Sequence, residues 1–164
     1  MNAYKLNHAY ADWVEADEYS LLLNLNTEQE LSYEHMSKLM CRYFYRAECN
    51  VFGYDIRYRY SRREKFRIKR VVAIEGDTKR THAHVMVKTL DGWANEKMLE
   101  LMRLTYEEVT DASADKRFLF EATEINSRTA VSRYITKDTY RQNTKLNDVI
   151  DLRSSFISKH SKGN

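Results

Sequence analysis

Residues 66–88 read FRIKRVVAIEGDTKRTHAHVMVK, and a sheet can be built outward from this segment. The apolar run from Val71 to Ile74 favours a buried strand that spans residues 66–75. The polar residues 76–80 predict a loop, and residues 81–88 predict a second strand. Because the loop is short, the two strands are expected to be neighbours in a hairpin.

The residues on either side supply further strands. Residues 19–26, YSLLLNLN, are mostly apolar and predict a central strand. Residues 54–60 alternate between apolar and charged side chains, which predicts a half-buried strand. Residues 118–125 predict the last strand. With the hairpin, the sequence therefore predicts five strands.

Helical periodicity occurs between and after these strands. Thr27 is expected to cap the first helix, with Glu30 completing a capping box. The elements together predict an α+β fold with a central, largely antiparallel five-stranded sheet flanked by helices. One domain is expected over residues 1–164, with its core at about 19–140 and a flexible tail at about 158–164. The predicted helices cover residues 28–49, 93–109, 127–140 and 149–157.

The composition excludes several classes of protein. Hydrophobic residues make up 43% of the 164 residues, as in folded globular chains, and no window is apolar enough for a membrane helix. None of the four glycines is followed by lysine, which excludes a phosphate-binding P-loop. Acids near the N-terminus argue against a signal peptide, and the spacing of Cys41 and Cys49 suits a reducing compartment. We therefore expect a cytoplasmic protein.

The distribution of charge is more informative than the net charge of +3. Residues 57–70 contain eight basic side chains and a single acid, Glu64. Such a cluster, with Tyr58, Tyr60 and Phe66 interleaved, could contact a phosphate backbone and stack on bases, but it could equally be a solvated hairpin. The basic residues that we assign to DNA binding are Arg57, Arg59, Arg62, Arg63, Lys65, Arg67 and, further along the chain, Arg141.

Two histidines in the second strand of the hairpin form a candidate metal site. The period of two in a strand puts His82 and His84 on one face, where they could grip a divalent cation. A pair of this kind also arises by chance, so it is weak evidence alone. Glu75 ends the preceding strand and could supply a third ligand, although it could be a surface acid and Asp77 competes for the role.

Tyr134 and Lys137 form a second candidate group. They are three residues apart on a predicted helix, so both could address one substrate. A phenol is a poor nucleophile at neutral pH, and a neighbouring ammonium group favours the phenolate. Asp138 and Arg141 follow on the same side of that helix. Tyr134 could also be an ordinary core tyrosine, which is the commoner fate.

Together these motifs resemble the HUH endonucleases, a family of replication initiators, relaxases and related transposases. The family's strand motif is His, apolar, His and three apolar residues, and residues 82–87 (HAHVMV) match it. The initiator branch also carries the pattern apolar-x-x-Tyr-apolar-x-Lys, which residues 131–137 (VSRYITK) match. The family's early strand motif corresponds to residues 21–26, which have Asn where Thr is frequent. The resemblance covers residues 19–140.

The resemblance implies a metal-dependent DNA nickase. Glu75, His82 and His84 would hold Mg²⁺ or Mn²⁺, with Asp138 as a further candidate ligand. Tyr134 would attack the scissile phosphate to form a 5′-phosphotyrosine, with Lys137 assisting by its charge. Tyr140 lies about 120° around the helix from Tyr134, which favours an enzyme with a single nucleophile.

The family also implies partners. The substrate would be single-stranded DNA or a DNA hairpin at a replication origin of a plasmid or virus. With no motor motif in the chain, either a host helicase unwinds the duplex or the chain is the nuclease part of a longer gene product, and a host polymerase would copy the DNA. A second protomer would complete a replication round, which suggests a homodimer. Two other interpretations remain open. The chain could be a transposase or relaxase-like nuclease of a mobile element, or a non-catalytic nucleic-acid-binding module with structural histidines.

Overall fold

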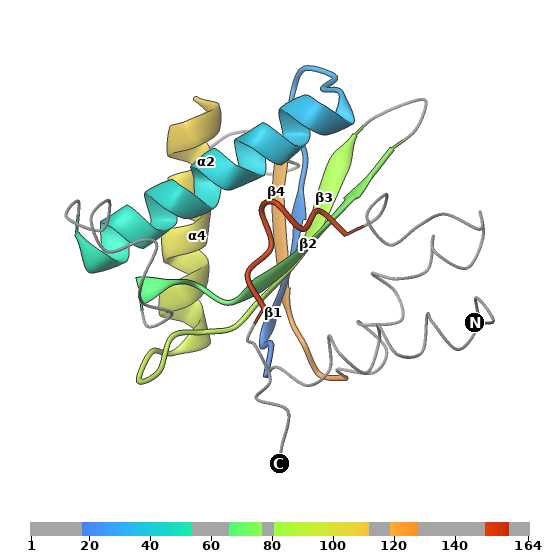
Figure 1. Ribbon diagram of the computed structural model, residues 1–164. Coiled ribbons are helices and arrows are strands. Elements are labelled where there is room, and N and C mark those ends of the chain that lie inside the picture. The colour runs from blue at the N-terminus through green and yellow to red at the C-terminus, as the bar shows by residue number, and fades with distance from the viewer. Residues whose placement is uncertain (1–17, 54–65, 77–80, 112–118, 128–149, 158–164) are drawn as a thin grey trace, which may run out of the picture.

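The computed structural model describes residues 18–53, 66–76, 81–111, 119–127 and 150–157. In these residues four strands form one antiparallel sheet with the order β2-β3-β1-β4, and both helices lie on one side of it (Figure 1). The protein therefore has an α+β fold, as predicted. Its elements in chain order are β1 (Leu21–Leu25), α2 (Tyr33–Phe52), β2 (Arg70–Glu75), β3 (His82–Val87), α4 (Asn95–Thr110) and β4 (Phe120–Glu124).

The central strand β1 shows how the two faces of the sheet differ. Alternation turns Leu21, Leu23 and Leu25 towards the helices, where all three are fully buried. Burial of one such side chain contributes about 1.5 to 3 kcal/mol. The prediction of a central strand here is confirmed, because β1 pairs with β3 on one side and β4 on the other. The leucines pack in one core with Val72, Ile74, Ala83, Val85, Val87, Met36, Met40, Tyr43, Phe44, Met98, Met102 and Tyr106.

Two tyrosines tie the helices to each other and to the end of β1. The Tyr43 hydroxyl donates to the Met102 carbonyl at 2.9 Å, and the Tyr106 hydroxyl donates to the Asn26 carbonyl at 2.6 Å. Their rings meet edge to face, with centroids 5.2 Å apart. Burial raises the pKa of both phenols above the ordinary value, so both remain neutral donors. The polypeptide that leaves β1 is thereby fixed in position.

The helix α2 begins later than the sequence predicted. We expected a start after Thr27, but the N-cap is Ser32, whose hydroxyl accepts a hydrogen bond from the His35 amide. The Thr27 hydroxyl instead donates to the Gln29 carbonyl, so it serves a local turn. The predicted capping box is therefore wrong. The helix ends at Gly53, whose φ of 86° suits glycine.

The prediction of a final helix at residues 149–157 is also wrong. Ile150 and Phe156 form bridges to Ala73 and Arg70, so the segment runs along the outer edge of β2. Between these bridges, the Asp151 carboxylate accepts hydrogen bonds from the Arg153 amide and the Ser154 hydroxyl. A side chain that caps its own turn competes with helix formation, and the sheet edge offers the backbone alternative partners.

A buried ion pair joins this segment to the helix layer. Arg70 Nη1 lies 2.6 Å from Glu48 Oε1, and both side chains are almost fully buried. The Arg70 Nε donates to the Ser154 carbonyl at 2.7 Å, and the guanidinium lies over the Phe44 ring. The Ile68 amide also donates to Glu48. This network connects α2, β2 and the C-terminal segment.

The other predicted elements agree with the structure less completely. The strands at 66–75, 81–88 and 118–125 are present but shorter, and the helix at 93–109 corresponds to α4. Four strands occur in the described residues, whereas we predicted five; the remaining one, at 54–60, lies outside them. The predicted helix at 127–140 and the tail at 158–164 lie almost entirely outside them as well. Among the described helices, none is both long and apolar enough to cross a membrane.

Candidate metal centre

The face of the sheet that lies away from the helices carries an acid and two histidines. Glu75 is the last residue of β2 and pairs with His82, the first residue of β3. His84 follows two residues later and therefore points to the same face. The side chains of Glu75 and His84 are 9% and 6% exposed, whereas that of His82 is 31% exposed. The group is thus buried on one side and open to solvent on the other.

The three side chains converge. Glu75 Oε2 lies 3.6 Å from Nε2 of His82 and 3.6 Å from Nε2 of His84. The potential ligand atoms of all three residues lie within 4.8 Å of one another. The two imidazole rings are perpendicular, with centroids 4.9 Å apart, so their nitrogens approach a common point from different directions.

These distances suit a single divalent cation. Ligand bonds of about 2.1 Å place two ligand atoms about 3.0 Å apart at right angles and about 3.4 Å apart in a tetrahedron. The 3.6 Å separations exceed these values by only a few tenths of an ångström. One carboxylate and two imidazoles would neutralise part of the charge and leave coordination positions for water or a phosphate oxygen. The residues present therefore fit a metal ion.

A fourth residue, Asn24, contacts the group from the central strand. It pairs with His84 in the register of β1 and β3, and its Oδ1 forms a short hydrogen bond with His84 Nδ1. A hydrogen bond to one ring nitrogen of a histidine orients the other nitrogen. The two residues are 60 positions apart, and no local pattern in the sequence connects them.

Apolar packing holds the rest of this face. Met86, which shares the face with His82 and His84, packs in a small cluster with Tyr19, Val71, Ala73 and Ile150. All five are buried. The cluster fixes the strands that carry the candidate ligands, so the group is rigidly supported on the side away from solvent.

Of the residues that we predicted for the metal site, three are brought together. Glu75, His82 and His84 form the single group of this kind found among the described residues. Asp77, the competing ligand, lies outside the described residues. Tyr134, Lys137, Asp138, Arg141 and Tyr140 lie outside them too, so their predicted roles stay predictions.

Of the predicted DNA-binding residues, the structure describes only Arg67. The others in the basic cluster, Arg57, Arg59, Arg62, Arg63 and Lys65, lie outside the described residues. Arg67 Nε lies 3.2 Å from Glu48 Oε1, and the guanidinium stacks over the Phe156 ring at 4.4 Å. Its side chain is 17% exposed. Arg67 therefore packs between α2 and the C-terminal segment.

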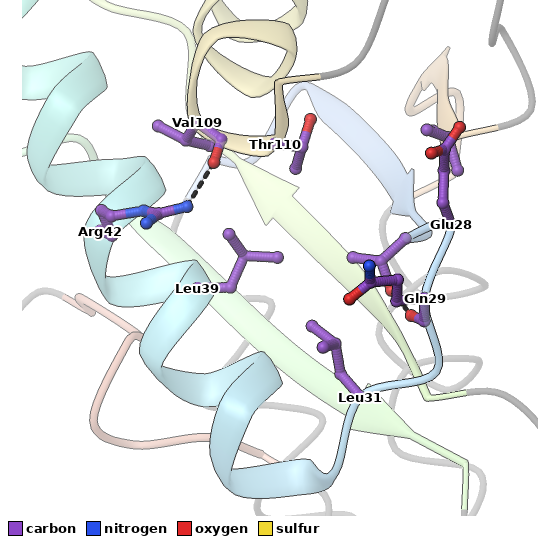
Figure 2. A pocket seen from close by; sticks show the side chains of 9 residues that line it. Glu28, Gln29, Leu31, Leu39, Arg42, Val109 and Thr110 are labelled. Atoms are coloured by element: carbon purple, nitrogen blue, oxygen red, sulfur yellow. Dashed lines mark hydrogen bonds between the residues drawn. The ribbon is translucent and has the colours of Figure 1, made fainter.

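A cavity of about 290 Å³ lies in the helix layer. Its walls come from the loop after β1, from α2 and from the end of α4, where Arg42 donates to the Val109 carbonyl (Figure 2). The lining combines three leucines and a valine with five polar side chains, and it contains none of Glu75, His82 and His84.

Comparisons with protein-family models, with curated proteins and with solved structures found no match.

Proposed function

We propose that this chain is a metal-dependent nickase of the HUH type, which cuts and rejoins single-stranded DNA at a replication origin with Tyr134 as its nucleophile. The observation that carries the proposal is the convergence of Glu75, His82 and His84 on one face of the sheet. In the family that the sequence resembles, the histidine motif occupies a strand in the same way. The predicted third ligand, Glu75, lies beside both histidines.

Described residues on either side of the tyrosine motif in the sequence pack on the face that carries Glu75, His82 and His84. The described residues stop at Ser127 and resume at Ile150. Before the gap, the Ile125 amide bonds to the Ser20 carbonyl, and after it Ile150 bridges to Ala73. Both isoleucines pack in the cluster on the face that carries the triad.

The proposed reaction is a transesterification. The phenolic oxygen of Tyr134 forms a bond to the scissile phosphorus, and the bond from that phosphorus to the 3′ oxygen breaks. The phenol gives up its proton, and the departing oxygen takes one to become a 3′-hydroxyl. The number of phosphodiester bonds is unchanged, so a 3′-hydroxyl can attack the phosphotyrosine and rejoin the strand.

The chain's own residues have separate tasks in this scheme. A bound Mg²⁺ or Mn²⁺ would polarise the scissile phosphate and stabilise the charge that develops on it. Glu75, His82 and His84 hold that ion, with Asp138 as an additional ligand. Lys137 favours the phenolate of Tyr134 by its positive charge. The DNA backbone would be bound by Arg57, Arg59, Arg62, Arg63, Lys65 and Arg141, whereas Arg67 packs against Glu48 and Phe156.

The same proposal includes the partners and the finer fold. A host helicase and polymerase would unwind and copy the DNA in the cytoplasm, and two protomers would complete one replication round. Residues 54–60 would add the fifth strand to the sheet. Each of these points depends on the nickase activity, which is therefore the first to be tested.

The test is formation of a covalent adduct. The protein is incubated with Mn²⁺ and a pool of single-stranded oligonucleotides that have a randomised centre and a label at the 3′ end, which stays on the fragment joined to the protein. The products are separated under denaturing conditions. We expect a slowly migrating protein–DNA species from the wild type. It should be absent with a chelator, in Tyr134→Phe and in His84→Ala, and present in the matched control Tyr140→Phe.

Other outcomes identify the alternatives. An adduct that persists in Tyr134→Phe and disappears in Tyr140→Phe would move the nucleophile to Tyr140. Tight binding to the pool without any adduct would favour the non-catalytic module. Adducts that form only on DNA hairpins, with two protein subunits paired around the hairpin ends, would favour the transposase.

A further inference from the structure

We propose that Asn24 is a positioning residue that fixes the proton of His84 on Nδ1 and thereby keeps the lone pair of Nε2 available to a cation. This inference rests on the proposed metal centre and adds to it a residue that acts through His84. The two residues are cross-strand partners in β1 and β3.

The hydrogen bond between them determines which ring nitrogen carries the proton. The amide oxygen of Asn24 has no hydrogen and can only accept, so His84 Nδ1 must donate. A neutral imidazole carries a single N–H, which leaves Nε2 with its lone pair. A metal ion needs this lone pair. In water the neutral histidine side chain prefers the opposite tautomer, with its proton on Nε2. The Nδ1 tautomer of His84 must therefore be stabilised by the contacts that His84 makes in the protein.

The competing acceptor is too distant to reverse this choice. Glu75 Oε2 is the acceptor near Nε2 and would favour a proton there. It lies 3.6 Å away, beyond the usual range of an N–H···O hydrogen bond, whereas Nδ1 is hydrogen-bonded to Asn24. The hydrogen bond to Nδ1 therefore decides the tautomer, and Glu75 faces Nε2, whose lone pair can bind a cation.

The placement of Asn24 in β1 is specific. The strand reads Leu-Leu-Leu-Asn-Leu, so Asn24 is its only polar residue, and it stands opposite His84. Its chain neighbours Leu23 and Leu25 are fully buried in the core under the helices. These anchors hold the Asn24 backbone, so the amide group meets His84 at a fixed position.

An amide in this role also sets the strength of the site. A carboxylate in the same place would make His84 a more basic ligand, so the site would bind the metal ion more tightly. The neutral Asn24 therefore favours a cation that exchanges readily. Asn24→Asp keeps the acceptor and adds charge, whereas Asn24→Leu removes the acceptor with little change in size.

The experiment measures the tautomer and the metal affinity separately. Long-range ¹H–¹⁵N NMR spectra of the metal-free protein, recorded at a pH at which the imidazoles are neutral, report which His84 nitrogen is protonated. We expect the proton on Nδ1 in the wild type and in Asn24→Asp, and on Nε2 in Asn24→Leu. Thr123→Val, which changes an exposed residue on the neighbouring strand β4, is the control and should match the wild type.

Titration with Mn²⁺ supplies the second readout. The affinity should fall about 10- to 100-fold in Asn24→Leu, stay equal or rise in Asn24→Asp, and stay unchanged in Thr123→Val. Asn24→Ala replaces Asn24→Leu if the leucine disturbs folding, which circular dichroism would detect. A wild-type spectrum with the proton on Nε2, or an Asn24→Leu affinity equal to that of the wild type, would overturn the inference. A wild type that binds no Mn²⁺ would instead refute the proposed metal centre, while the NMR comparison would still decide the tautomer.

Discussion

The two faces of the sheet use the same strands for different purposes. On β3, Ala83, Val85 and Val87 are fully buried towards the helices, whereas His82 and His84 turn to the other face. A strand alternates its side chains with a period of two, so a single segment can serve packing and chemistry together. A shift of one residue in register would exchange the two sets and destroy both. The tight packing of one face thus fixes the geometry of the other.

The faces also differ in how they treat charge. The helix-covered face contains Arg70 and Glu48 as a buried pair with several hydrogen-bond partners. On the opposite face, Glu75 lies beside the imidazoles of His82 and His84, and the His82 side chain is partly exposed to solvent. A buried charge whose partner is removed is costly, whereas a charge near solvent can find water or an ion. Substitutions on the two faces should therefore have different consequences.

The largest effect on stability is expected from Arg70→Met. It leaves Glu48 buried with a weaker set of partners, and loss of one member of such a pair costs about 3 to 5 kcal/mol. Urea unfolding monitored by circular dichroism measures the loss. Arg103→Met is the matched control, because its pair with Glu107 is partly exposed and should contribute less than about 1 kcal/mol. If both variants lose the same free energy of unfolding, burial of the pair between Arg70 and Glu48 does not increase the cost of breaking it.

The double variant Glu48→Gln with Arg70→Met sharpens this result. It removes the uncompensated charge but keeps an acceptor for the Ile68 amide. We expect it to be more stable than Arg70→Met alone. A further loss in the double variant would mean that charge burial is not the source of the effect.

A smaller and pH-dependent effect is expected where the two helices meet. A hydrogen bond from Arg46 lowers the pKa of Glu108 below its ordinary value. The folded-state pKa is therefore lower than that of the unfolded chain, so the pair stabilises the fold above the unfolded pKa. This contribution disappears as the pH falls through the folded pKa.

The test compares wild type and Glu108→Gln by urea unfolding at pH 7 and pH 3. At pH 7 the variant should be less stable by only a fraction of 1 kcal/mol, because the pair is partly exposed. At pH 3 the difference in stability between the two proteins should be smaller than at pH 7. Glu121→Gln, on the exposed strand β4, is the control. A difference that grows at low pH would contradict the sign of the pKa change.

The sequence predicted those parts of the fold and the site that depend on local patterns. The apolar run at 71–74 and the short polar loop at 76–80 were enough to pair two strands and to place Glu75 beside His82. Once that hairpin forms, the convergence of the triad follows from the period of the strand. The helix corresponding to α4 was predicted to within two residues at each end, because helical periodicity is also a local pattern.

The contacts that the sequence did not predict are distant along the chain. Asn24 meets His84, and Arg67 meets Glu48, because separate elements are brought together by packing. The start of α2 depends on which hydroxyl accepts a hydrogen bond from a backbone amide of the first turn. Thr27 and Ser32 are chemically similar, but the Ser32 hydroxyl makes this bond, whereas the Thr27 hydroxyl donates to the Gln29 carbonyl. The C-terminal segment carries a helical pattern, but it pairs with the edge of β2 instead. Tertiary hydrogen bonds outweighed local preference there.

The measurement that tests the central claim most directly is a Mn²⁺ titration followed by electron paramagnetic resonance. It compares the wild type with His84→Ala on the candidate metal face and His35→Ala, an exposed histidine in the first turn of α2. We expect one ion per chain in the wild type and in His35→Ala, and an affinity at least about tenfold weaker in His84→Ala. Equal binding by His84→Ala and the wild type, or no binding by the wild type, would contradict the assignment of Glu75, His82 and His84 as a metal centre.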